Sequence, residues 1–315
     1  MIQLAQAAQL ILALVLTNSG GEGKSTWAEV LSALARLAGL NVIVADVDPG
    51  NRGYLNRNGD GSALSLDWSP AGTGQKALAD PALWFDEHLA GRNLAILDTG
   101  ANMLAAANPI NQFIGGLIEV ARRKGAKIVV FGVTSPNKAG SDDLIEMMYQ
   151  RFRRGAEVIV VQNNRDGSGT FNSSIAQLGT PIIGLPHLDP GLQTVRLRRC
   201  MPLDEVLTTP ESGFERATAL IAKRLMHAAR QEPIKEIVGT TALESLRTLA
   251  SQAPTATHYR ISNLESADNA SLTANEGVAK AWSHFRKADK HDASGFLKAS
   301  ESLWDAEQRW LARGR

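Results

Sequence analysis

LILALVLTNSGGEGKST, residues 10–26, is the stretch that decides the fold. Its first seven residues are all apolar, as in a parallel strand that helices cover on both faces. A glycine-rich loop follows directly, and residues 27–38 continue as a helical pattern. A signal peptide is the alternative for an apolar run near the N-terminus, but no basic residue precedes it and no small-x-small cleavage site follows. We therefore expect a buried strand, a phosphate-binding loop and a helix, in that order.

Similar apolar runs recur along the chain and alternate with amphipathic helical stretches. They lie at residues 42–45, 94–97, 128–133, 158–161 and 182–184. This alternation predicts an α/β fold, a doubly wound and mostly parallel sheet with helices on both faces. Ligands of such sheets bind beyond the carboxyl ends of the strands. The loops after these runs are therefore where a site is expected.

The loop at residues 18–26 has the residue types that cradle phosphates. Its glycines let backbone N–H groups converge on phosphate oxygens, and the following helix adds a favourable dipole. Lys24 can reach the β- and γ-phosphates, and the Ser25 hydroxyl can ligate Mg²⁺. Asn18 stands where the general GxxxxGK[ST] pattern has its first glycine. The candidate nucleotide-binding residues of this loop are Gly20, Gly21, Glu22, Gly23, Lys24, Ser25 and Thr26.

Three further strand ends carry polar side chains that suit a nucleotide site. VIVADVDPGN at residues 42–51 ends in Asp46 and Asp48, of which one can serve Mg²⁺ and the other the attacking water. LAILDTG at residues 94–100 brings Asp98 to a strand end, as a Walker B carboxylate would be. VIVVQNN at residues 158–164 ends in amides that can hydrogen-bond a purine edge. We expect Ser25, Asp46 and Asp98 to be the Mg²⁺ ligands.

Composition limits the alternatives. A chain of 315 residues with 44% hydrophobic residues can bury a sizeable core, and its net charge of +1 makes any DNA binding regional. The single cysteine, Cys200, excludes an internal disulfide and a cysteine-based zinc site, which fits a reducing cytoplasm. We expect Cys200 itself to be a small, buried or half-buried apolar residue. No other segment has the length of apolar sequence that a membrane span requires.

At this point the sequence resembles a family, the ParA/MinD group of deviant Walker A P-loop ATPases. The resemblance covers about residues 8–228 and rests on GGEGKST, DVDPGN, LDTGA and LPHLDPGLQTVRLRRCMPLDEVL. It implies ATP and Mg²⁺ as cofactors and an ATP-dependent homodimer that works with an adaptor or cargo protein. By this resemblance Lys24 would bind phosphate, Ser25 and Asp98 would serve Mg²⁺, and Asp48 would orient the hydrolytic water. The residues that would lie at the adenine are Asn163, Asn164, Pro186 and Asp189.

One position departs from the family. Its signature lysine, which reaches into the partner's site across the dimer, would stand at position 19, and the residue here is Ser19. Loss of that cation predicts slow hydrolysis unless another cation substitutes for it. Lys138, in the loop TSPNKAG after the strand at residues 128–133, is the candidate for that catalytic role. A plain exposed loop lysine is the alternative.

A modestly basic surface is expected near the late helices. Residues 193–230 contain seven Lys or Arg against four acidic residues. Such a density favours weak, salt-sensitive, non-specific DNA binding, and a solvated helix face is the alternative. The candidate DNA-binding residues are Arg196, Arg198, Arg199, Lys223 and Arg224.

After residue 232 strand-like runs disappear. We expect a ParA/MinD-like domain over residues 1–232 and a helical C-terminal extension over residues 233–315. Apolar residues at helical spacing over 278–311 fit a helix that packs on the ATPase domain, on a dimer mate or on a partner, and acidic residues there argue against a membrane surface.

The leading hypothesis is a cytoplasmic ATPase switch that partitions or positions a plasmid or protein cargo, and association with the nucleoid would follow from its DNA binding. The alternative is a nucleotide-binding accessory subunit, for example of a conjugation or secretion apparatus, with little ATPase activity and acting through its C-terminal helices. An enzyme of metal-cluster chemistry is disfavoured because Cys200 is the only thiol.

Overall fold

The computed structural model describes part of the chain around a single parallel sheet. The described residues are 9–17, 20–48, 51–59, 61–66, 80–100, 109–136, 141–165, 171, 173–188, 199–210 and 215–251. Within them, no helix is long and apolar enough to cross a membrane.

The sheet has seven strands in the order β3-β2-β4-β1-β5-β6-β7, and every pair is parallel. The strands are β1 (Ile11–Leu16), β2 (Val42–Val47), β3 (Leu64–Ser65), β4 (Leu94–Thr99), β5 (Lys127–Thr134), β6 (Glu157–Asn163) and β7 (Ile182–Leu185). The fold prediction is confirmed. The sequence pattern missed only β3, a two-residue edge strand too short to show a period.

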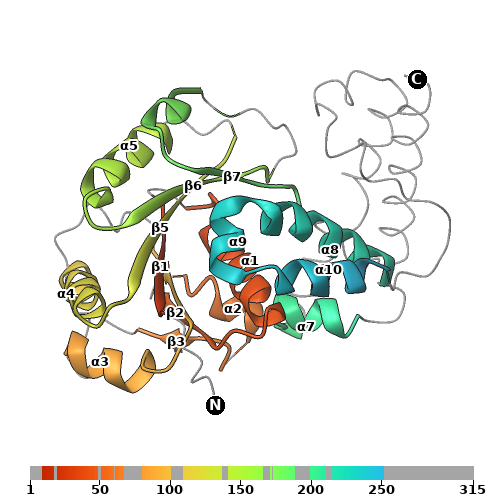
Figure 1. Cartoon of the computed structure of the whole chain (residues 1–315), viewed down its shortest axis with the longest axis horizontal. Coiled ribbons are helices and arrows are strands. Elements are labelled where there is room, and N and C mark those ends of the chain that lie inside the picture. The colour runs from red at the N-terminus through yellow and green to blue at the C-terminus, as the bar shows by residue number, and fades with distance from the viewer. Residues whose placement is uncertain are drawn as a thin grey trace, which may run out of the picture.

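Helices cover both faces of the sheet (Figure 1). On one face lie α3 (Pro81–His88), α4 (Pro109–Arg123), α5 (Ser141–Phe152) and the short helix η1 (Ser173–Leu178). On the other lie α1 (Lys24–Leu37), α7 (Leu203–Thr208), α8 (Glu215–Arg230), α9 (Glu232–Val238) and α10 (Thr241–Ser251). The four-residue helix α2 (Leu55–Asn58) follows β2.

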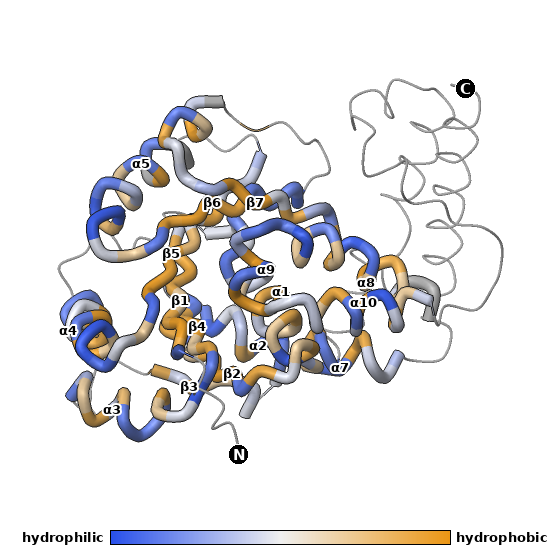
Figure 2. Tube along the Cα trace, viewed as in Figure 1, coloured by the Kyte–Doolittle hydropathy of each residue, from blue (hydrophilic) through white to orange (hydrophobic). Residues whose placement is uncertain are grey.

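Strand β1 explains why the sheet is buried on both sides. Leu12, Leu14 and Leu16 enter the core under α3, α4 and α5, whereas Ala13 and Val15 enter the core under α1. The strands therefore form an apolar band through the middle of the molecule (Figure 2). This two-sided burial fixes the carboxyl end of β1, from which the glycine-rich loop departs.

The described residues after 232 belong to the same core as α1. Ile234 and Val238 of α9, with Ala242 and Leu246 of α10, are buried in the cluster that contains Trp27. The side chain of Ser245 on α10 also donates a hydrogen bond to the carbonyl of Leu37, at 3.0 Å. This part of the chain thus supports the helix that carries the phosphate loop.

The prediction that Cys200 is buried or half-buried is wrong, because its side chain is exposed. Cys200 stands in a turn just before α7 with a left-handed φ of 48°, and its Sγ lies 3.7 Å from the carbonyl of Asn56. A turn position outside the packed elements has no core side to face.

Candidate nucleotide site

The glycine-rich loop joins β1 to α1 in a geometry that only glycine allows at position 23. Gly23 has φ 97°, and a Cβ there would lie 2.0 Å from the Nδ2 atom of Asn163. Gly23 is also the N-cap of α1, and no side chain caps that helix. The N–H groups of the first turn are therefore oriented for an anionic ligand.

A buried group of opposite charges lies at this loop. Lys24 is 8% exposed and Asp98, at the end of the neighbouring strand β4, is 1% exposed. Burial raises the pKa of the Asp98 carboxyl from 3.8 to about 7, against the lowering effects of a hydrogen bond with Ser25 and of the charges of Lys24 and Arg57. The negative charge of Asp46 adds to the rise. A cation placed beside Asp98 would stabilise its ionised form.

Asp98 and Ser25 fit the role of Mg²⁺ ligands. The Oδ1 atom of Asp98 is buried and has no hydrogen-bond partner among the described residues, while Ser25 supplies a hydroxyl to the same carboxyl group. A buried carboxylate oxygen requires a partner, and a hydrated divalent cation provides one. No group of three or more His, Cys, Asp or Glu in the described part of the chain could hold a metal alone. The site therefore suits Mg²⁺ that arrives with a phosphate ligand.

Asp46 and Asp48 make different contacts, because Asp46 lies within β2 whereas Asp48 follows its last residue, Val47. Both carboxyl oxygens of Asp46 accept backbone N–H groups, from Asp48 at 3.1 Å and from Tyr54 and Leu55 at 3.0 and 3.1 Å. Asp46 is thereby committed to anchoring α2. Asp48 is half-buried and lines the cavity beside the loop.

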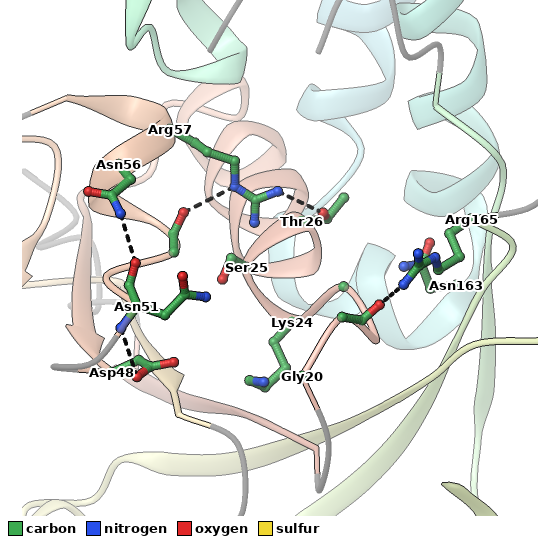
Figure 3. A pocket seen from close by; sticks show the side chains of 13 residues that line it. Gly20, Lys24, Ser25, Thr26, Asp48, Asn51, Asn56, Arg57, Asn163 and Arg165 are labelled. Atoms are coloured by element: carbon green, nitrogen blue, oxygen red, sulfur yellow. Dashed lines mark hydrogen bonds between the residues drawn. The ribbon is translucent and has the colours of Figure 1, made fainter. Parts of the chain in front are cut away.

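That cavity measures about 600 Å³ and runs from Asp48 to Arg165 across the phosphate loop (Figure 3). One wall comes from the segment after β2, including Asn51 and Arg57. Arg57 and Arg165 were not predicted from the sequence. Arg165 directly follows the amide pair at the end of β6, which was the available signal, whereas nothing in the pattern marked Arg57.

The amides at the end of β6 support the loop. Asn163 is buried, and its Nδ2 donates to the carbonyl of Glu22 at 2.8 Å. The backbone N–H of Asn164 donates to the carbonyl of Leu185 on β7 at 2.9 Å. Arg165 donates to the carbonyl of Gly21. Asn163 and Arg165 thus hold the glycine loop against the end of β6, and Asn164 connects β6 to β7. These residues mark the base end of the cavity, where the nucleotide base was expected.

Glu22 and Pro186 complete the predicted positions that the structure describes. The Glu22 side chain is 1% exposed and accepts a hydrogen bond of 2.5 Å from the hydroxyl of Ser135, after β5. The Glu22 carboxylate therefore contacts the segment after β5, and Glu22 does not line the cavity. Pro186 is half-buried and follows β7.

The candidate DNA surface is described in part. Arg199 is exposed, whereas Lys223 and Arg224 on α8 are half-buried. Arg224 donates to the carbonyl of His187, so its guanidinium ties α8 to the segment after β7. Seven features of the sequence analysis lie outside the described residues: Asn18, Ser19, Lys138, Asp189, Arg196, Arg198 and the apolar stripe at 278–311.

The elements together form a P-loop architecture, a glycine loop between a central parallel strand and a helix with a carboxylate on the adjacent strand. Solved structures similar to this chain include MinD and ParA family ATPases. The MinC:MinD cell division complex of Aquifex aeolicus is 16% identical, covers 79% of this chain and 99% of its own, and has a TM-score of 0.42. For the cell division ATPase MinD of Pyrococcus furiosus these values are 17%, 76%, 99% and 0.44. For a ParA family ATPase of Chlorobium tepidum they are 15%, 75%, 98% and 0.42.

No protein-family model and no curated protein matches the chain. The residues of the site therefore provide the argument for function.

Proposed function

We propose that this chain is an ATP-binding, ATP-hydrolysing switch that dimerises with ATP and partitions or positions a plasmid or protein cargo. The observation that carries the proposal is the convergence of Lys24, Ser25 and Asp98 at the glycine loop, with a buried Asp98 oxygen that has no partner among the described residues. This group suits the phosphates of a nucleotide and an accompanying Mg²⁺ ion.

Each residue has a distinct task in this proposal. Lys24 binds the β- and γ-phosphates, and the first-turn N–H groups of α1 complete the cradle. Ser25 and Asp98 hold Mg²⁺, which would neutralise negative charge on the phosphates when bound. Asp48 orients the hydrolytic water, because it lines the cavity while Asp46 is used to anchor α2.

Hydrolysis is slow and partner-stimulated in this proposal, because Ser19 replaces the cationic residue that the resembled family uses there. Lys138 is the proposed substitute. The ATP-bound dimer acts in the cytoplasm, with an adaptor or cargo protein and with non-specific DNA contacts from Arg199, Lys223 and neighbouring cations.

Steady-state ATP turnover tests the proposal, with and without non-specific DNA and with Lys24→Ala as the background. Lys235→Ala, at a half-buried position on α9 outside the cavity lining, is the matched lysine control. We expect turnover in wild type and in Lys235→Ala, stimulation by DNA, and none in Lys24→Ala. ATP binding without turnover under any condition would instead favour the nucleotide-binding accessory subunit, for which Ser19 is the supporting residue.

A further inference from the structure

Arg57 is held beside the first turn of α1 by three contacts. Its Nε lies 2.9 Å from Oε1 of Glu29, a side chain on α1 that is 1% exposed. The same Nε donates to the carbonyl of Gly53 at 3.0 Å, and Nη1 donates to the hydroxyl of Thr26 at 3.3 Å (Figure 3). These contacts fix both the position and the plane of the guanidinium group.

The backbone of the same segment lies close to the phosphate loop. A Cβ on Gly53 would lie 2.6 Å from the Ser25 hydroxyl. Arg57, Thr26, Ser25 and Gly53 all line the cavity. The segment after β2 thus touches two consecutive hydroxyl residues of the loop, and Arg57 acts on the second of them.

The contact with Thr26 has a chemical consequence. A threonine hydroxyl has one hydrogen to donate and two lone pairs that accept. The oxygen accepts from the Arg57 cation, which leaves the hydroxyl hydrogen to be donated to another acceptor, and Thr26 lines the cavity. The positive charge of Arg57 also extends across the site, where it opposes the rise that burial causes in the pKa of Asp98.

We propose that Arg57 is a positioning residue for the nucleotide phosphates, which makes Thr26 a hydrogen-bond donor toward a phosphate oxygen and adds positive charge behind it. This inference rests on the nucleotide binding proposed above. Thr26 lies on the far side of Ser25 from Asp48 in Figure 3, so the phosphate concerned is one that ADP and ATP share and not the γ-phosphate that Asp48 would serve.

A double-mutant cycle tests the proposal, with the Kd of MgADP and of MgATP measured by calorimetry for Arg57→Ala, Thr26→Val and both together. We expect each single variant to weaken both nucleotides about tenfold, since one charge-assisted contact is lost. The double variant should be about as weak as either single variant, because the two residues act through one contact. Multiplied effects of about a hundredfold, an unchanged Arg57→Ala, or a loss confined to MgATP would each overturn the proposal.

Two further variants separate positioning from a purely structural role. Arg57→Lys keeps a cation beside Thr26 and should stay within about threefold of wild type, whereas a loss equal to that of Arg57→Ala would count against the proposal. Glu29→Gln weakens the ion pair and leaves Arg57 in place, so its Kd should also stay within about threefold. If Glu29→Gln weakens binding as much as Arg57→Ala, Arg57 serves only the fold and the proposal is refuted.

A control variant and the binding of wild type separate a failure of this inference from a failure of the proposed function. Arg123→Ala removes an exposed arginine at the end of α4 and should bind both nucleotides like wild type. Absence of nucleotide binding by wild type itself would refute the proposed function and this inference together. Normal binding by wild type and by Arg57→Ala would refute this inference alone.

Discussion

The two ends of the cavity differ in how their polar groups are used. At the phosphate end, Asp98 keeps a buried oxygen without a partner among the described residues, and no side chain caps α1. At the other end, Asn163 and Arg165 donate their side-chain hydrogens to carbonyls of the glycine loop. The polar groups of the phosphate end can therefore bind a nucleotide or Mg²⁺, whereas those of the base end hold the glycine loop in place.

Removal of the buried cation gives the largest expected effect on this comparison. Lys24→Ala deletes the charge-assisted contacts to two phosphates, each worth about 1.5 to 3 kcal/mol, so nucleotide affinity should fall at least about a hundredfold. Calorimetric titration with MgATP measures this loss, with Lys235→Ala, which lies outside the cavity lining, as the matched control. Affinity within tenfold of wild type would mean that the phosphates do not sit at the glycine loop.

Gly23→Ala adds one methyl group and tests the close packing of the glycine loop on Asn163. Gly23→Ala imposes a left-handed φ on alanine and a collision with Asn163, and should cost about 2 kcal/mol or more of unfolding free energy. Gly39→Ala shares the left-handed φ of 76° but meets nothing within 4 Å, so it isolates the backbone cost. Urea denaturation of both variants gives the comparison. Equal destabilisation would show that the packing on Asn163 is not tight.

The sequence predicted the phosphate end better than the base end, for a physical reason. Six strands and the positions of Lys24 and Asp98 follow from apolar runs and from what stands at their ends, which are local features. The role of Asn163 depends on the conformation of a loop 141 residues away along the chain, and hydrophobic periodicity carries no such information. Arg57 was missed for the same reason, since its partners Thr26 and Glu29 lie on another element.

Helices α9 and α10 illustrate the same limit. Helices were expected after residue 232, but that expectation did not say which surface these two would cover. The structure places Ile234 and Leu246 in the core that includes α1.

The raised pKa of Asp98 predicts a pH dependence at the phosphate end. Folding raises this pKa from 3.8 to about 7, so the folded state binds the proton more tightly and stability falls as pH rises between these values. The slope is up to about 1.4 kcal/mol per pH unit, and Asp98→Asn should remove it. Urea denaturation of both proteins at several pH values between 5 and 7, with EDTA present, measures the difference. Parallel pH profiles for wild type and variant would show that Asp98 is not the source of the pH dependence.

The smallest expected effect is at the base end. Asn163→Ala removes one buried hydrogen bond to the loop and should cost about 1 kcal/mol of stability. Because the Asn163 Nδ2 is already used by Glu22, the ratio of ATP to GTP affinity should change by less than about threefold. Competition binding of the two nucleotides measures that ratio. A large change would assign Asn163 to recognition of the base.

The most direct measurement of the central claim is a titration of wild-type chain with ATP in Mg²⁺ and again in EDTA, with Asp98→Asn in parallel. We predict that one nucleotide binds per chain and that it binds at least about tenfold more weakly in EDTA. Mg²⁺ should have little effect on binding by the variant, because the buried oxygen of Asp98 is the proposed Mg²⁺ ligand. Absence of ATP binding by wild type in either buffer, or an undiminished Mg²⁺ effect in Asp98→Asn, would contradict the account.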